Sequence, residues 1–329
     1  MDVSIWVWLT TVGLLVGLLA ADVFIIGRRP HEPSLRECVI AITLYVALAL
    51  IFGLAVLFTS GPRYAGEFYA GWLTEYSLSI DNLFVFVIIM ARLAVPRPLQ
   101  QTALLVGIIL ALVMRGIFIA LGAAAINQFS WVFYIFGAFL VVTAVRLATH
   151  KEDDAKDFKE NALLRFLQKR LPATDDYRGV KLLVRENGRR LMTPMLVVIV
   201  ALGTTDLLFA LDSIPAIYGL TKEPYLVFAA NVFALMGLRQ LYFLIGGLLE
   251  RLVYLSLGLS AVLAFIGVKL VLEALHGNEL PFINGGEHVG VPEIPIWGSL
   301  VVILSTLAVT TVASLVKARG DRAEPVHRD

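Results

Sequence analysis

The sequence predicts an all-α polytopic membrane protein with about nine transmembrane helices. Of its 329 residues, 58% are hydrophobic and 16% are charged, and the mean hydropathy is +0.81. Such a chain has too little polar surface to cover a water-soluble protein of this length. The 27 Lys and Arg residues nearly balance the 26 Asp and Glu residues, so the net charge does not point to a nucleic-acid partner.

Nine apolar runs are long enough to cross a bilayer, whose hydrocarbon core of roughly 30 Å needs about 20 apolar residues per helix. They cover residues 3–26, 38–59, 68–91, 103–126, 129–148, 194–220, 225–249, 252–275 and 296–316. The first run has no basic residue before it and is followed by Gly27-Arg28-Arg29-Pro30 instead of a small-residue cleavage site. We therefore expect it to remain as a helix and not to be removed as a signal peptide.

The loop charges predict the orientation of these helices. With the N-terminus outside, the inner loops and the C-terminal tail hold 21 Lys and Arg residues, while the outer loops hold only Arg63 and Lys222. Basic residues gather in cytoplasmic loops. The sequence therefore predicts a multi-pass protein of the inner (plasma) membrane, with the N-terminus outside and the C-terminus inside.

The expected organisation has seven parts along the chain. These are two N-terminal helices (1–67), a first three-helix repeat (68–148), a charged cytoplasmic insert (149–193), a second three-helix repeat (194–275), an extracytoplasmic loop (276–295), a last helix (296–316) and a cytoplasmic tail (317–329). Within the insert, Pro172 and Gly179 favour a turn between two short helical segments. The outer loop carries Glu279, Glu287, His288 and Glu293 without Lys or Arg, and it is either an ordinary solvated loop or one that attracts cations.

Two spans carry the same pattern of acids. The third reads Thr74-Glu75, five further residues, then Asp81-Asn82, and the sixth reads Thr205-Asp206, five further residues, then Asp212-Ser213. The likeness continues downstream, where Arg115 and Arg239 each stand seven residues before a glycine and Val145-Arg146-Leu147 resembles Val268-Lys269-Leu270.

Each of these copies is three spans long, and an odd number of crossings turns the second copy upside down in the membrane. The sequence thus predicts a 3+3 inverted repeat. That architecture is typical of secondary transporters, which bind their substrate near the midplane between the two copies.

Six of the charged residues in the repeated spans lie towards the middle of a span, and each costs about 2.5 to 3.5 kcal/mol at a helix centre. They are Glu75, Asp81, Arg115, Asp206, Asp212 and Arg239. One reading makes the two arginines static struts that pair with acids. The four acids still leave two negative charges uncompensated, and a divalent cation or two protons would neutralise them.

Acids six residues apart point about 120° away from each other on a straight helix. A local break would bring them together, and Asp81-Asn82 and Asp212-Ser213-Ile214-Pro215 resemble N-cap signals that restart a helix. A simple kink at Pro215 is the alternative. Asp22, near the inner interface, is either a local partner of basic residues or part of an inner gate.

The candidate metal ligands are all oxygen donors. They are Glu75, Asp81, Asn82, Asp206, Asp212 and Ser213, with Asn231 and Asp22 as possible additions and Arg115 and Arg239 as charge partners. Hard oxygen ligands suit Mg, Ca or Mn better than Zn or Cu. The single cysteine, Cys38, excludes an internal disulfide, a CxxC metal site and an iron–sulfur cluster, and we expect no prosthetic group.

The segments Glu75–Phe86, Phe209–Ala216 and Asn231–Arg239 closely resemble the TerC/Alx family of membrane proteins, and the resemblance extends over nearly the whole chain. It implies a fold related to the LysE-type exporters, a role in metal-ion homeostasis with manganese efflux, and an association with tellurium resistance. It also implies that Glu75, Asp81, Asp206 and Asp212 bind the ion. One departure is Gly203, where many relatives carry a glutamate.

Taken together, the residues and the resemblance predict a secondary transporter that exports a divalent cation, Mn²⁺ first of all, with protons as a possible coupling ion. The alternative from another class is a membrane scaffold or sensor in the metal or tellurite stress response, acting through residues 151–190. An enzyme is not expected, because the sequence shows no Ser/His dyad and no zinc signature.

Overall fold

The computed structural model describes residues 3–28, 34–129, 131–149, 174, 176–186, 189–245 and 254–323. Its long helices are α1 (Ile5–Arg28), α2 (Leu35–Ser60), α3 (Pro62–Arg92), α4 (Arg97–Gln128), α5 (Val132–Thr149), α7 (Pro194–Tyr218), α8 (Pro224–Leu235), α9 (Leu238–Ile245), α10 (Leu255–His276) and α11 (Ile296–Ala323). Two short strands, β1 (Leu183–Glu186) and β2 (Arg189–Met192), precede α7.

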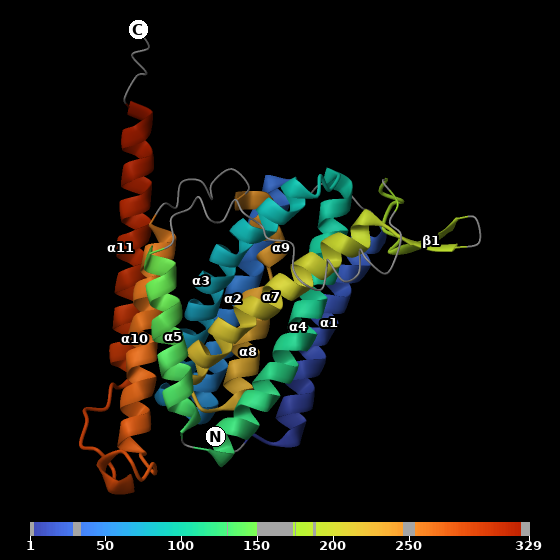
Figure 1. The fold of residues 1–329 in the computed structure, drawn as a ribbon. Coiled ribbons are helices and arrows are strands. Elements are labelled where there is room, and N and C mark those ends of the chain that lie inside the picture. Colours follow the sequence, from blue (N-terminus) through green and yellow to red (C-terminus); the bar gives the residue numbers. More distant parts are fainter. Residues whose placement is uncertain are drawn as a thin grey trace.

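The all-helical membrane fold is confirmed. Within the described residues, eight spans are long and apolar enough to cross a membrane, with α8 and α9 together forming one of them, and the apolar stretch Ile5–Leu18 of α1 adds a shorter one. The start of α1 and the end of α11 lie at opposite ends of the bundle (Figure 1), as an odd number of crossings requires. The orientation in the membrane stays a prediction.

The helices of the two expected repeats interlock. Helix α3 packs against α8, α4 against α7, and α5 against α10 (Figure 1). If α3 is exchanged with α7, α4 with α8 and α5 with α10, the same three packing pairs result. The packing order agrees with an inverted repeat, and the repeat itself stays a prediction.

Helices α5 and α10 cross closely, and each of them has a glycine at the crossing. A Cβ added at Gly137 would stand 2.8 Å from the carbonyl oxygen of Gly267, and one added at Gly267 would stand 3.0 Å from that of Gly137. The flanking contacts are reciprocal too, because Val271 faces Gly137 as Val141 faces Gly267. Small residues let membrane helices approach this closely.

This crossing gives an offset between the two expected repeats that differs from one of the sequence matches. The reciprocal contacts pair Gly137 with Gly267, 130 residues apart, whereas the match between Val145-Arg146-Leu147 and Val268-Lys269-Leu270 implies 123 residues. The sequence matches themselves fall into two groups, because Glu75 and Asp206 are 131 residues apart and Arg115 and Arg239 are 124 apart. The match of the two valine segments stays a prediction.

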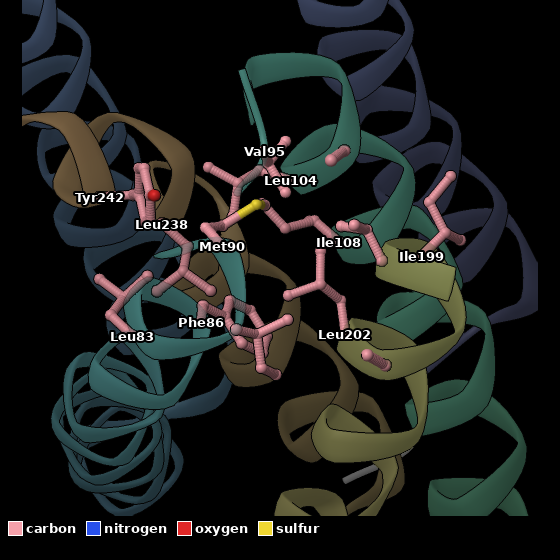
Figure 2. Packing of buried hydrophobic residues seen from close by; sticks show 14 of the residues in the cluster. Leu83, Phe86, Met90, Val95, Leu104, Ile108, Ile199, Leu202, Leu238 and Tyr242 are labelled. Atoms are coloured by element: carbon pink, nitrogen blue, oxygen red, sulfur yellow. The ribbon is translucent and has the colours of Figure 1, made fainter. Parts of the chain in front are cut away.

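A hydrophobic cluster fills the bundle at the end where α3 turns into α4. Figure 2 shows side chains from α3, α4, α7 and α9 interlocking there, among them Phe86, Met90, Leu104, Leu202 and Tyr242. Each of these five is less than 8% exposed. The cluster therefore closes this end of the bundle with apolar side chains.

The predicted helix breaks are wrong in their position. Helix α3 runs through Asp81-Asn82, and α7 runs through Pro215 without a break. The break lies instead in the seventh span, where α8 ends at Leu235 and α9 begins at Leu238. Gly237 has a φ of +88° there, a backbone conformation that glycine adopts at no steric cost.

The insert also differs from expectation where it is described. Instead of a second helical segment, β1 and β2 form an antiparallel hairpin in which Leu183 pairs with Met192 and Glu186 with Arg189. Asn187-Gly188 stands between the strands in the sequence, and this dipeptide is a strong hairpin signal. Residues 151–173, where the first helical segment is expected, lie outside the described residues.

We expect Gly137→Val to destabilise the protein by roughly 1 to 3 kcal/mol, because the added atoms meet backbone of α10 that cannot move aside. Gly116→Val is the matched control, since a Cβ at Gly116 has no neighbour within 4 Å. Thermal unfolding of both variants in detergent, followed by tryptophan fluorescence, measures the difference. Equal melting temperatures would mean that the α5–α10 crossing is not tightly packed.

Candidate ion site

The side chain of Arg115 lies at the centre of the candidate site. It is fully buried in α4 and points at the acids of both copies. Nε and Nη2 donate to the two carboxylate oxygens of Asp206 at 3.2 and 3.1 Å, and Nη1 forms an ion pair with Glu75 Oε1. One guanidinium on α4 thus joins an acid of α3 to an acid of α7.

Two neutral groups complete the surroundings of this guanidinium. Arg115 Nη1 also donates to Asn231 Oδ1 at 3.0 Å and to Ser213 Oγ at 3.4 Å. The amide nitrogen of Asn231 donates to the carbonyl of Val227, one turn earlier in α8, which fixes the orientation of its oxygen. The cluster therefore contains residues of α3, α4, α7 and α8.

The charges in this cluster do not balance. Glu75, Asp206 and Arg115 are 0%, 2% and 0% exposed, and two carboxylates share one guanidinium. Among the described residues, Glu75 Oε2 has no hydrogen-bond partner. A buried carboxylate oxygen without a partner is costly, so the cluster has a surplus negative charge and an unused ligand atom.

Other polar atoms on the same stretch of α3 are also unsatisfied. Trp72 Nε1, Thr74 Oγ1 and Ser79 Oγ are buried and have no hydrogen-bond partner within the part of the chain that the structure describes. Trp72, Glu75 and Ser79 follow one another at spacings of three and four, which places them along one side of the helix. Such groups call for water or an ion beside them.

Asp212 lies apart from this cluster. It is half-buried, and its Oδ1 accepts a hydrogen bond of 3.1 Å from Thr143 on α5. Because α7 is continuous, the six-residue spacing turns Asp206 towards α4 and Asp212 towards α5. Thr143 was not among the predicted residues, and no motif marks it in the sequence.

The remaining predicted site residues are described in part. Asn82 and Arg239 are buried, at 7% exposed each, while the side chains of Asp81 and Asp22 lie outside the described ones. Arg239 and Gln240 line a cavity of about 20 Å³ beside the break at Gly237, which is room for one water molecule. Sequence reasoning missed Gln240, whose buried Oε1 has no hydrogen-bond partner in the described part of the protein.

Among the described residues, no three His, Cys, Asp or Glu side chains converge as a metal site would require. The cluster itself holds two acids, and Arg115 stands between them. Gly203, one turn before Asp206, faces the side chain of Leu110 on α4, which would lie 2.4 Å from an added Cβ. The glycine thus allows α7 to lie close to α4.

The opposite end of the bundle is held by polar contacts. Thr221 donates to the buried Glu67 at 2.6 Å, and Lys222 forms a 2.6 Å ion pair with Glu273 on α10. In the following loop His276 lies 3.0 Å from Glu293. Within the described residues, apolar side chains therefore pack at one end of the bundle, and hydrogen bonds and ion pairs form at the other.

Comparison with known proteins agrees with the resemblance found in the sequence. The family model described as "Integral membrane protein TerC family" matches residues 60–322. An uncharacterized membrane protein of Mycobacterium tuberculosis is 49% identical over 97% of this chain and 81% of its own. A protein of Escherichia coli named "Putative membrane-bound redox modulator Alx" is 35% identical over 93% of both chains. No solved structure matches.

Arg115→Ala should lower the yield of folded protein before any specific loss of transport, because it leaves two buried acids without their cation. Removing one partner of a buried pair costs about 3 to 5 kcal/mol. We expect a similar loss for the buried Arg239. The control is Arg63→Ala, whose side chain is 79% exposed in its pair with Glu67 and should change stability by at most about 1 kcal/mol. Size-exclusion profiles of the detergent extracts give the comparison, and wild-type yield of Arg115→Ala would contradict a structural role for the ion pair.

Proposed function

Since the chain belongs to the TerC family of integral membrane proteins, we propose that it is a secondary transporter that exports a divalent metal cation, with Mn²⁺ as substrate. The observation that supports this most directly is the buried cluster of Glu75, Asp206 and Arg115, whose surplus negative charge calls for a cation. Charged residues inside membrane spans typically mark an ion path.

The donor set supports the class of ion. Carboxylate, amide and hydroxyl oxygens surround Arg115, and no cysteine or histidine is among its partners. Mg²⁺, Ca²⁺ and Mn²⁺ prefer such ligands. The preference for Mn²⁺ within this group rests on the family resemblance.

When no metal ion is bound, the guanidinium of Arg115 is the cation that pairs with the acids of the cluster. A metal ion that enters the cluster competes with the guanidinium for the oxygens of Glu75 and Asp206. Asn231 and Ser213 already accept hydrogen bonds from the guanidinium, so they keep it partly satisfied when one acid turns to the metal. Arg115 then returns when the ion leaves, and the acids are not left unpaired at any stage.

The alternative is a membrane scaffold or sensor in a stress response. The relative named a redox modulator suggests redox chemistry, but this chain has one cysteine, and Cys38 is buried, so it has no dithiol of its own to oxidise. Metal accumulation in cells that lack the protein distinguishes the two functions. A scaffold would leave the cellular Mn²⁺ content unchanged.

Asp81→Asn and Asp212→Asn should each abolish Mn²⁺ efflux while leaving expression and membrane insertion intact. Each change removes a charged ligand and also lowers the cost of insertion. In Asp212→Asn the side chain keeps the oxygen that accepts from Thr143. The matched control is Asp176→Asn, an exposed acid of the insert, which should transport normally. Uptake into liposomes that contain a metal-sensitive dye measures the flux, and normal transport by both variants would show that neither aspartate lies on the ion path.

A proton gradient should accelerate this flux. We expect protons and the metal ion to compete for the same acids, so that metal binding is accompanied by proton release. In liposomes, an imposed pH gradient should speed Mn²⁺ movement, protons should move in the opposite direction, and Asp81→Asn should lose both effects together. Metal flux that is indifferent to the gradient, with a constant internal pH, would indicate a uniporter or a channel instead.

A further inference from the structure

The hairpin before α7 is fixed to the ends of two membrane helices. Tyr177 donates through its hydroxyl to the carbonyl of Leu93, just after α3, at 2.7 Å. Thr193, just before α7, donates to the carbonyl of Lys181 at 2.6 Å. Burial raises the pKa of Tyr177, which keeps its hydroxyl protonated as a donor. The base of the hairpin therefore lies where α3 ends and α7 begins.

One face of this segment forms a shallow surface pocket with basic walls. It is lined by Arg178, Lys181, Leu183, Val184 and Arg185, and its three basic residues are exposed. In such a pocket, the headgroup and the glycerol backbone of a phospholipid would contact basic and apolar side chains at the same time.

Apolar side chains surround the pocket on the same segment. Val180 is 53% exposed, Leu183 47% and Leu182 36%. Large exposed apolar side chains next to basic ones are typical of segments that lie in the membrane interface, with the apolar groups towards the acyl chains and the basic groups towards the headgroups.

The charge and the position of the hairpin also favour contact with the membrane interface. Residues 178–190 contain five Lys and Arg and one acid. In Figure 1 the hairpin projects sideways from the end of the bundle, level with the ends of neighbouring helices. Because the ends of membrane helices lie near the membrane surface, we expect this segment to run along that surface.

We propose that this pocket binds the headgroup of an anionic phospholipid in the leaflet next to the hairpin. Lys181 and Arg185 attract the phosphate, and Val180, Leu182 and Leu183 contact the upper part of the acyl chains. Anionic lipids attract basic side chains near the surface, and each such side chain contributes about fivefold to the binding constant. The proposal is independent of the transported ion.

The chemistry favours a lipid over the two other anionic partners. A free phosphate would use the basic walls and leave the exposed leucines and valine in water. An acidic soluble protein would pair with the basic side chains, but the hairpin is fixed beside the ends of α3 and α7, where its exposed apolar side chains are within reach of acyl chains. Only a lipid places charge and hydrocarbon at the same depth.

The test uses the full chain with one added cysteine, Val180→Cys, labelled with an environment-sensitive dye. The native Cys38 is buried and 0% exposed, so the dye reports on the hairpin. Phosphatidylglycerol titrated into the protein in a neutral detergent should shift the emission to the blue. Lys181→Gln/Arg185→Gln should weaken the apparent binding constant about thirty-fold, and phosphatidylcholine should give no shift.

The matched control is Arg36→Gln/Lys317→Gln, which removes two exposed basic residues of α2 and α11 and should bind like the parent protein. A response to phosphatidylcholine equal to that of phosphatidylglycerol would overturn the proposal. So would an unchanged binding constant in Lys181→Gln/Arg185→Gln. A response to inorganic phosphate at matched ionic strength would show a free anion site in place of a lipid site.

Discussion

The central constraint on this structure is that charges inside a membrane must be neutralised by other charges. Arg115 meets this constraint by pairing with Glu75 and Asp206 at once, and its remaining donors reach Asn231 and Ser213. Because these residues belong to α3, α4, α7 and α8, the position of one guanidinium decides how four helices can sit together. The apolar cluster at one end and the polar contacts at the other add to that arrangement.

The sequence predicted well what depends on local composition. Apolar runs define the spans because each helix must meet hydrocarbon on its own, and the acids stood out because charges are rare in such runs. Which acid meets which arginine depends on helix packing, and the sequence left Arg115 without an assigned partner. Thr143 and Gln240 were missed because single polar residues carry no spacing signal.

Two errors had identifiable causes. The predicted helix breaks at Asp81 and Asp212 relied on capping residues. A membrane helix that already satisfies its backbone hydrogen bonds gains little from a cap. The break lies at Gly237 instead, where the backbone needs a positive φ. The hairpin signal Asn187-Gly188 was overlooked in favour of charge alternation.

The glycine crossing between α5 and α10 limits which motions are available to the protein. With each glycine against the carbonyl of the other helix, sliding or separating the two would break close backbone contacts along both, so they should travel as a single rigid body. A rearrangement of the bundle would then have to leave this pair intact and move the neighbouring helices around it.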